Sequence, residues 1–105
     1  MSLTVTVNNK AATRGQFYRT FSVAFDSSYP TGGESFDNDD VALAKIDFVI
    51  LEPNSGYVFE YDYTNEKIIA YYGDNDNTVD AALTQVANTT DLSGLTAVRG
   101  IAFGV

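Results

Sequence analysis

Residues 57–72, YVFEYDYTNEKIIAYY, constrain the fold of this 105-residue chain more than any other stretch. Aromatic side chains recur at every second position over residues 57–63, which is the period of a strand with one buried face. Residues 64–66 are turn formers, and residues 67–72 return as a β-branched and aromatic run. The stretch therefore predicts a β-hairpin.

Similar short runs, separated by polar turns, recur along the chain without an internal repeat or a linker. They predict an all-β protein: a single antiparallel β-sandwich domain over residues 1–105, jelly-roll-like, with under ~10% helix. The predicted strands are residues 3–7, 17–25, 45–51, 57–63, 67–72 and 96–103, with a weaker run at 79–86.

The segments between these strands carry turn chemistry. Residues 8–15 are interpreted as a polar connection, and residues 26–35, DSSYPTGGES, as a long irregular loop of the kind that often has a function. The acidic residues before 41–43 predict one helical turn capped by an Asp, and residues 90–94 predict a turn or a short 3₁₀ segment.

Composition excludes several classes of site. The chain has no His, Cys or Trp, which excludes Ser-His-Asp and Cys-His nucleophiles, Cys/His zinc sites and disulfides. No apolar run approaches the ~18 residues of a membrane helix, and the start lacks the features of a signal peptide. We therefore expect no membrane partner and synthesis in the cytoplasm.

Charge is distributed unevenly. Residues 1–25 carry Lys10, Arg14 and Arg19 and no acid, a net charge of +3, whereas residues 26–105 carry three basic and fourteen acidic residues, a net charge of −11. An acidic body repels phosphate backbones, so we expect no nucleic-acid partner. The basic residues are either solvated charges or part of a docking strand or arm within residues 1–20, and Arg19, on the apolar face of its strand, is expected near a strand end or an interface.

Acidic residues supply two candidate sites, and both have a simpler interpretation. Residues 74–80 place oxygen ligands at alternate positions of a Ca²⁺ loop, but Val79 and Gln85 occupy the positions that need Gly and Glu in an EF-hand. A solvated hairpin tip is favoured there. Glu60 and Asp62 fit the spacing of glycosidase carboxylates, yet such pairs also keep a sheet face soluble. The sequence predicts no catalytic residue, no cofactor and no metal site.

The hairpin also supplies a candidate interface. Ile69 and Tyr71 alternate with Ile68, Ala70 and Tyr72, so one of these two sets faces outward. Seven Tyr exceed what a small core holds, and Tyr is enriched at interfaces. We therefore predict that the protein associates with copies of itself through Ile69 and Tyr71.

Three runs resemble small virion proteins of tailed bacteriophages. The runs are SVAFDSSYPTGGESF (22–36), GYVFEYDYTNEKIIAYY (56–72) and TDLSGLTAVRGIAFGV (90–105). The chain is similar to capsid decoration, or cement, proteins, which sit as trimers on the outside of the head. The resemblance implies a non-enzymatic virion protein of the outer capsid surface, whose partners are the major capsid protein and itself as a homotrimer. Such a protein stabilises the shell against internal DNA pressure, and Lys10, Arg14 and Arg19 would help it to grip an acidic patch.

An alternative from another class is a receptor- or glycan-binding module of a phage fibre or tail tip. In that case Tyr29 in the 26–35 loop, or the outward tyrosines, would stack on sugar rings. A small carboxylate enzyme is the third and least favoured hypothesis. The resemblance does not indicate which surface faces the capsid.

Overall fold

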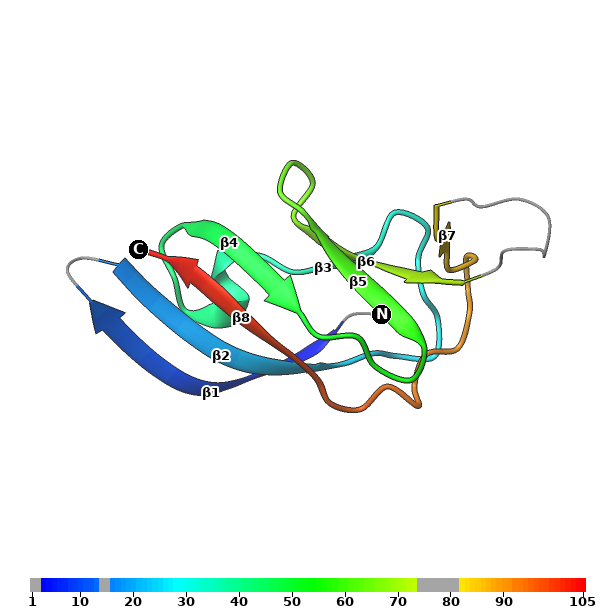
Figure 1. The fold of residues 1–105 in the computed structure, drawn as a ribbon, viewed down its shortest axis with the longest axis horizontal. Helices are drawn as coiled ribbons and strands as arrows, with labels where there is room; N and C mark the ends of the chain where they lie inside the picture. The colour runs from blue at the N-terminus through cyan, green and yellow to red at the C-terminus, as the bar shows by residue number, and fades with distance from the viewer. Residues whose placement is uncertain (1–2, 14–15, 74–81) are drawn as a thin grey trace.

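Two antiparallel β-sheets make up the part of the chain that the computed structural model describes, residues 3–13, 16–73 and 82–105, with 9–13 as backbone only (Figure 1). The first sheet has the strand order β1-β2-β8-β4, and the second has the order β3-β6-β5 with β7 beside β6. The elements are β1 (Thr4–Thr13), β2 (Gln16–Ala24), β3 (Glu34–Ser35), the 3₁₀ helix η1 (Asn38–Val41), β4 (Ile46–Leu51), β5 (Tyr57–Asp62), β6 (Lys67–Tyr72), β7 (Thr84–Gln85) and β8 (Val98–Gly104).

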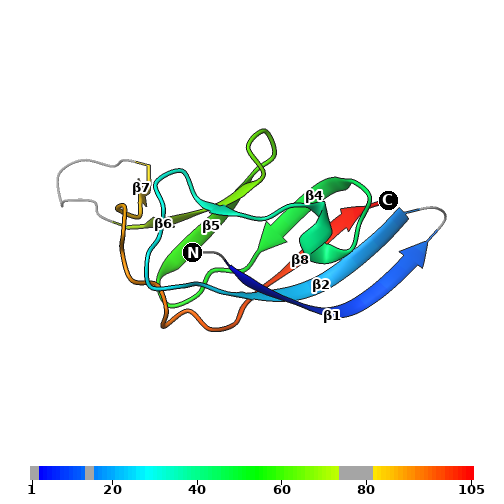
Figure 2. The ribbon, with the colours of Figure 1, turned by 180° about the vertical axis from the view of Figure 1, so that it is seen from behind.

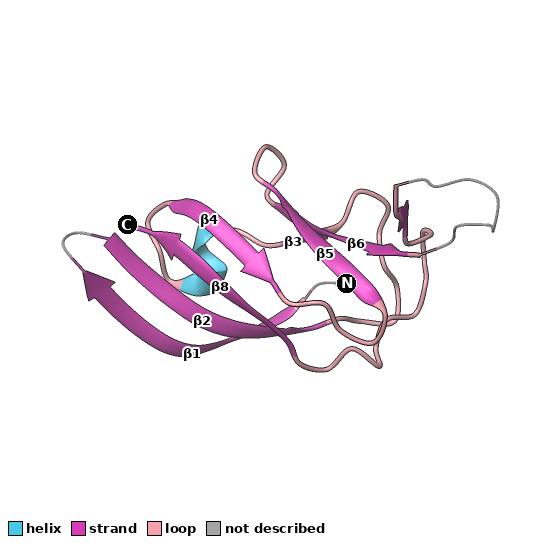
Figure 3. Ribbon diagram, viewed as in Figure 1, coloured by secondary structure: helices cyan, strands magenta, loops and turns pink. Residues whose placement is uncertain are grey.

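The antiparallel β-sandwich predicted from the alternating runs is confirmed, and Figure 3 shows strands throughout with one short helix in the described residues. Five of the six main strands lie within about two residues of their predicted bounds. The strand order does not establish the predicted jelly-roll connectivity. β1 and β2 form a simple hairpin within the first sheet, and β5 and β6 form one within the second.

The prediction that residues 8–15 form a polar connection is wrong for residues 8–13. β1 continues through them, and its register shifts at a bulge between Val7 and Asn9 before Lys10 pairs with Arg19. The backbone hydrogen bonds of β2 hold this part of β1 in place even though its sequence does not alternate. Residues 4–13 and 16–20 therefore belong to a hairpin of the first sheet, and the predicted docking strand is an integral part of that sheet.

One apolar core lies between the two sheets. The hairpin of β5 and β6 buries Phe59, Tyr61, Ile68 and Ala70 on its inner face, as its alternation predicts. The first sheet contributes Phe21, whose ring centroid lies 5.0 Å from that of Phe36. The fully buried apolar residues also include Val23, Val41, Val98 and Ala102.

The first sheet extends beyond the area that the second sheet covers, as both ribbon views show (Figures 1 and 2). Phe17 lies on the core side of β2 but is 37% exposed, because it stands near the end of this overhang. The helix η1 lies near β1 and is closed at its start by a capping box between Asp37 and Asp40. The structure thus has a helical turn capped by an Asp, but on the acidic residues themselves: the turn was expected at residues 41–43, and it ends at Val41 because Ala42 adopts the left-handed conformation.

The loop at residues 26–35 is fixed by the core. Tyr29 is fully buried, and its backbone pairs with Thr90. Gly32 and Gly33 adopt φ values of +95° and +106°, which only glycine tolerates at low cost. The segment then joins the second sheet as β3, which pairs with β6. The loop therefore has a structural role: it places Tyr29 in the core and leads the chain into β3.

Candidate functional site

Apolar side chains gather on the outer face of the first sheet, the face turned away from the core. Tyr18 on β2, Phe103 on β8 and Phe48 on β4 lie side by side in the sheet register. The ring of Phe103 has its centroid 6.1 Å from that of Tyr18 and 6.3 Å from that of Phe48. We call these three residues, together with Ile50 and Ile101 in the neighbouring row, the aromatic strip.

Strand periodicity explains how the strip arises. β4 turns Val49 and Leu51 into the core, and the alternation of a strand therefore turns Phe48 and Ile50 outward. Phe48 is 46% exposed and Ile50 is 50% exposed, and both are large apolar side chains. An antiparallel sheet with one solvated face normally carries polar residues at such positions. Tyr18, Ile101 and Phe103 beside them are half-buried, so the strip is a partly exposed apolar row, and larger exposed apolar patches are typical of interaction sites.

A shallow groove of about 520 Å³ includes the end of the strip that Ile50 and Ile101 form. Ile50 and Ile101 form its apolar part, and Asn8 and Thr20 add polar groups. Arg99 and Glu52 border it with an ion pair whose Nε–Oε1 distance is 3.1 Å. The groove therefore has an apolar floor and a charged rim, the arrangement of a protein interface.

The second sheet presents a smaller apolar surface on its own outer face. Ile69 and Tyr71 point away from the buried Ile68 and Ala70, which is the geometry that the alternation predicts, and both are half-buried. Val58 lies opposite Tyr71 in the register. Val58, Tyr71 and Leu83 line a hollow of about 420 Å³. We call Val58, Ile69, Tyr71 and Leu83 the hairpin face.

Of the predicted basic residues, Arg19 is the one whose side chain the structure describes. Arg14 and the side chain of Lys10 lie outside the described residues. The Arg19 guanidinium donates hydrogen bonds to the backbone oxygens of Tyr18 (3.2 Å) and Ala42 (3.1 Å) and lies 5.5 Å from the ring centroid of Phe17. It therefore helps to hold η1 against the first sheet. Arg19 is the fourth of the nine residues of β2 and pairs with Lys10 and Ala102, so it lies within the strand and not at the strand end that was one of its two expected places.

The suggestion that Tyr29 stacks on a sugar is wrong. Its ring is fully buried, and its hydroxyl accepts a hydrogen bond from the Ala70 nitrogen at 3.1 Å. A loop rich in Gly and Pro appears exposed from its sequence, but the aromatic residue inside it completes the core.

The predicted carboxylate pair is also held by local contacts. Glu60 accepts a hydrogen bond from the Tyr71 hydroxyl, and Asp62 closes the hairpin turn by accepting from the backbone nitrogens of Thr64 and Asn65. These turn contacts, led by the Asn65 side chain, lower the pKa of Asp62. The carboxyls thus have structural partners on the strand and at the turn. The possible cation loop at 74–80 lies outside the described residues.

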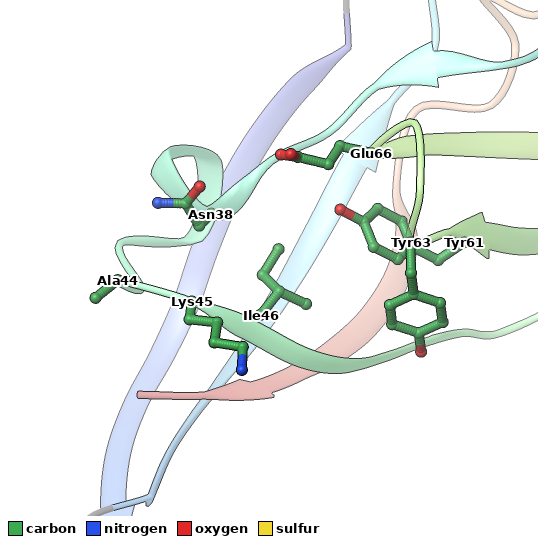
Figure 4. Close-up of a pocket in the computed structure, with 7 residues that line it drawn as sticks. All are labelled: Asn38, Ala44, Lys45, Ile46, Tyr61, Tyr63 and Glu66. Carbon is green, nitrogen blue, oxygen red and sulfur yellow. The ribbon is translucent and has the colours of Figure 1, made fainter.

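Figure 4 shows a small hollow between the start of β4 and the β5–β6 turn. Its volume of about 210 Å³ is below the range of ordinary ligand pockets, roughly 300–1,000 Å³. The Tyr61 hydroxyl donates to the Phe36 oxygen at 2.8 Å, and the Tyr63 hydroxyl accepts from the Val49 nitrogen at 3.1 Å. Burial, with a smaller contribution from nearby carboxylates, raises the pKa of Tyr61 to about 12, so it remains a neutral donor. The hydroxyls of Tyr61 and Tyr63 therefore have a structural role, because each bonds the backbone of another segment.

Within residues 3–13, 16–73 and 82–105, no three acidic side chains lie where they could share a metal ion. The same residues contain no helix with the length and apolar character of a membrane span. Comparisons with protein-family models, with curated proteins and with solved structures each found no match. The aromatic strip is thus the most developed candidate site that the described residues offer.

Proposed function

We propose that this protein is a capsid decoration (cement) protein of a tailed bacteriophage, a non-enzymatic component of the virion that binds the outside of the head. The observation that carries the proposal is the exposed aromatic strip on the outer face of the first sheet. Its apolar side chains suit a persistent contact with another protein. The resemblance of the three sequence runs supplies the class of partner, the assembled capsid.

The two apolar surfaces suit a molecule with two contacts. The aromatic strip would lie on the capsid, and the hairpin face, with Ile69 and Tyr71, would meet neighbouring copies in a homotrimer. A trimer matches sites where three capsid subunits meet. A protein that binds the assembled lattice, but not dissociated subunits, stabilises the lattice by mass action.

Charge would orient the complex and is not concentrated on the aromatic strip. The first 25 residues carry a net charge of +3, and β1 and β2 belong to the same sheet as the strip, but Arg19 lies on the core side of β2, opposite the strip. Arg99 at the rim of the groove is paired with Glu52. Exposed ion pairs contribute only ~0–1 kcal/mol each, so apolar contact would provide most of the affinity and charge would orient the complex.

The proposal is tested on heads of the encoding phage that have been stripped of this protein. The purified protein should co-sediment with such heads and raise the temperature at which they release DNA. Equal release temperatures with and without the protein would refute the cement function.

Two variants locate the contact. Ile50→Asp places a charge in the centre of the strip and should weaken head binding at least ~10-fold, because a buried unpaired charge is costly. Ala87→Asp introduces the same charge at an exposed position in the loop after β7, and should bind like the unmodified protein. Equal binding by both variants would exclude the strip as the capsid contact.

A further inference from the structure

A carboxyl group is buried at the point where the second sheet begins. Glu34, the first residue of β3, is 1% exposed, although glutamate is almost never fully buried unless it is paired. The preceding Gly33 lets the chain approach β6 closely: a Cβ atom at Gly33 would lie 2.5 Å from the Ile68 oxygen. The backbone geometry therefore directs this side chain into the protein.

Asp26 brings a second carboxyl to the same place from the end of β2 in the first sheet. Its Oδ1 accepts a hydrogen bond from the Ser28 nitrogen at 2.9 Å, and its backbone oxygen accepts one from the Leu92 nitrogen at 3.1 Å. These bonds fix its position. With both carboxyls ionised, Asp26 Oδ2 and Glu34 Oε2 are buried and have no hydrogen-bond partner among the described residues.

The described residues contain little that could satisfy these two oxygens. Tyr29 lies close enough for the charge of Glu34 to act on it, but its hydroxyl hydrogen is directed to Gln85 Oε1 at 3.3 Å. The ion pairs among the described residues include neither Asp26 nor Glu34. Desolvation, followed by the charge and hydrogen bonding of Asp26, raises the pKa of Glu34 to about 7, and the positive amino terminus acts in the opposite direction with a smaller effect.

We infer that Glu34 and Asp26 form a proton-binding site that joins the two sheets: the folded protein holds one proton between the two carboxyl groups and releases it as the pH rises through neutrality. A single proton turns one acceptor into a donor, so it satisfies both unpartnered oxygens at once. Without it, two buried negative charges face each other. The inference does not depend on the proposed function.

The site predicts an unusual dependence of stability on pH. Because the pKa of Glu34 is about 7 in the folded protein and 4.5 as the reference value, the stabilisation is complete below pH 4.5 and is lost as the pH rises to about 7. Between pH 5.5 and pH 8.5 the unfolding equilibrium constant should rise roughly 30-fold. The sequence has no His, so no other side chain with an ordinary pKa titrates in this interval.

Carbon-13 NMR of the side-chain carboxyl carbons tests the site in the unmodified protein. The Glu34 Cδ resonance should titrate near pH 7, because the carboxyl is buried beside Asp26. If Glu34 is fully ionised at pH 5.5, the inference is overturned. This measurement decides the matter even where a variant does not fold.

Urea denaturation of two matched variants provides the second test. Glu34→Gln donates a permanent N–H in place of the proton, so its unfolding constant should stay constant between pH 5.5 and pH 8.5, whereas the exposed control Glu60→Gln should show the full rise. Parallel pH profiles for the unmodified protein and Glu34→Gln would overturn the inference. A second result would also overturn it: calcium at pH 8.5 stabilises the unmodified protein but not Glu34→Gln. The site would then bind a cation instead of a proton.

Discussion

Two tyrosine hydroxyls make the same hydrogen bond in different surroundings, and their removal should have different costs. The Tyr29 hydroxyl accepts from the Ala70 nitrogen, and the Tyr63 hydroxyl accepts from the Val49 nitrogen, each at 3.1 Å. Tyr29 is fully buried, whereas Tyr63 is 50% exposed. Tyr29→Phe and Tyr63→Phe therefore form a pair that differs in burial and in the second hydrogen bond that the Tyr29 hydroxyl donates to Gln85.

Tyr29→Phe leaves the buried Ala70 N–H without an acceptor and removes the bond that the hydroxyl donates to Gln85. A buried unpaired amide costs ~1–3 kcal/mol, so we expect a loss of about 2–3 kcal/mol in the free energy of unfolding. The Val49 N–H lies on an edge strand, where water can replace the Tyr63 hydroxyl. Tyr63→Phe should therefore cost less than about 1 kcal/mol.

Urea denaturation at pH 5.5, followed by circular dichroism, measures both losses. With a slope of roughly 1–3 kcal/mol per molar urea for a small protein, Tyr29→Phe should lower the midpoint by about 1–2 M and Tyr63→Phe by less than half as much. Equal shifts for the two variants would refute the reasoning, because burial would then not set the cost of the lost bond.

Two further predictions concern the core and the hairpin face. Phe59→Ala removes a buried ring whose centroid lies 5.3 Å from that of Phe25, and it should destabilise the protein by ~3–5 kcal/mol in the same urea assay, whereas a loss under 1 kcal/mol would contradict the core assignment. If the protein is a homotrimer through the hairpin face, Ile69→Asp or Tyr71→Asp should give monomers in native mass spectrometry; a monomeric unmodified protein at micromolar concentration would contradict the trimer.

The fold was predictable where alternation is strong. Over residues 57–72 the aromatic and β-branched residues at every second position identified both strands and their buried face. Residues 8–13 lack such a pattern, so their sequence does not predict a strand. Their place in β1 depends on pairing with β2 across a bulge, which is a tertiary effect. The short strands β3 and β7 have two residues each, too few to carry a period.

The aromatic strip was not predicted, although a signal was present. The run at residues 45–51 is apolar without interruption from Phe48 to Leu51, and in an antiparallel fold such a strand has either two buried faces or an apolar outer face. The choice depends on whether a layer covers the second face, which the sequence of one strand does not contain. Burial of Glu34 was equally hidden, because a Gly-Gly turn followed by an acid is typical of exposed loops.

The edges of the first sheet indicate how a partner would bind the strip. On β4 the outward N–H of Val49 is already bonded to the Tyr63 hydroxyl, so this edge is blocked against strand addition. The other edge, β1, carries Lys10, a residue type that discourages edge-to-edge pairing. Contact through the sheet face is therefore favoured over extension of the sheet. Face contacts depend on side chains and not on backbone hydrogen bonds, which is why a single change at Ile50 should weaken binding while leaving the fold intact.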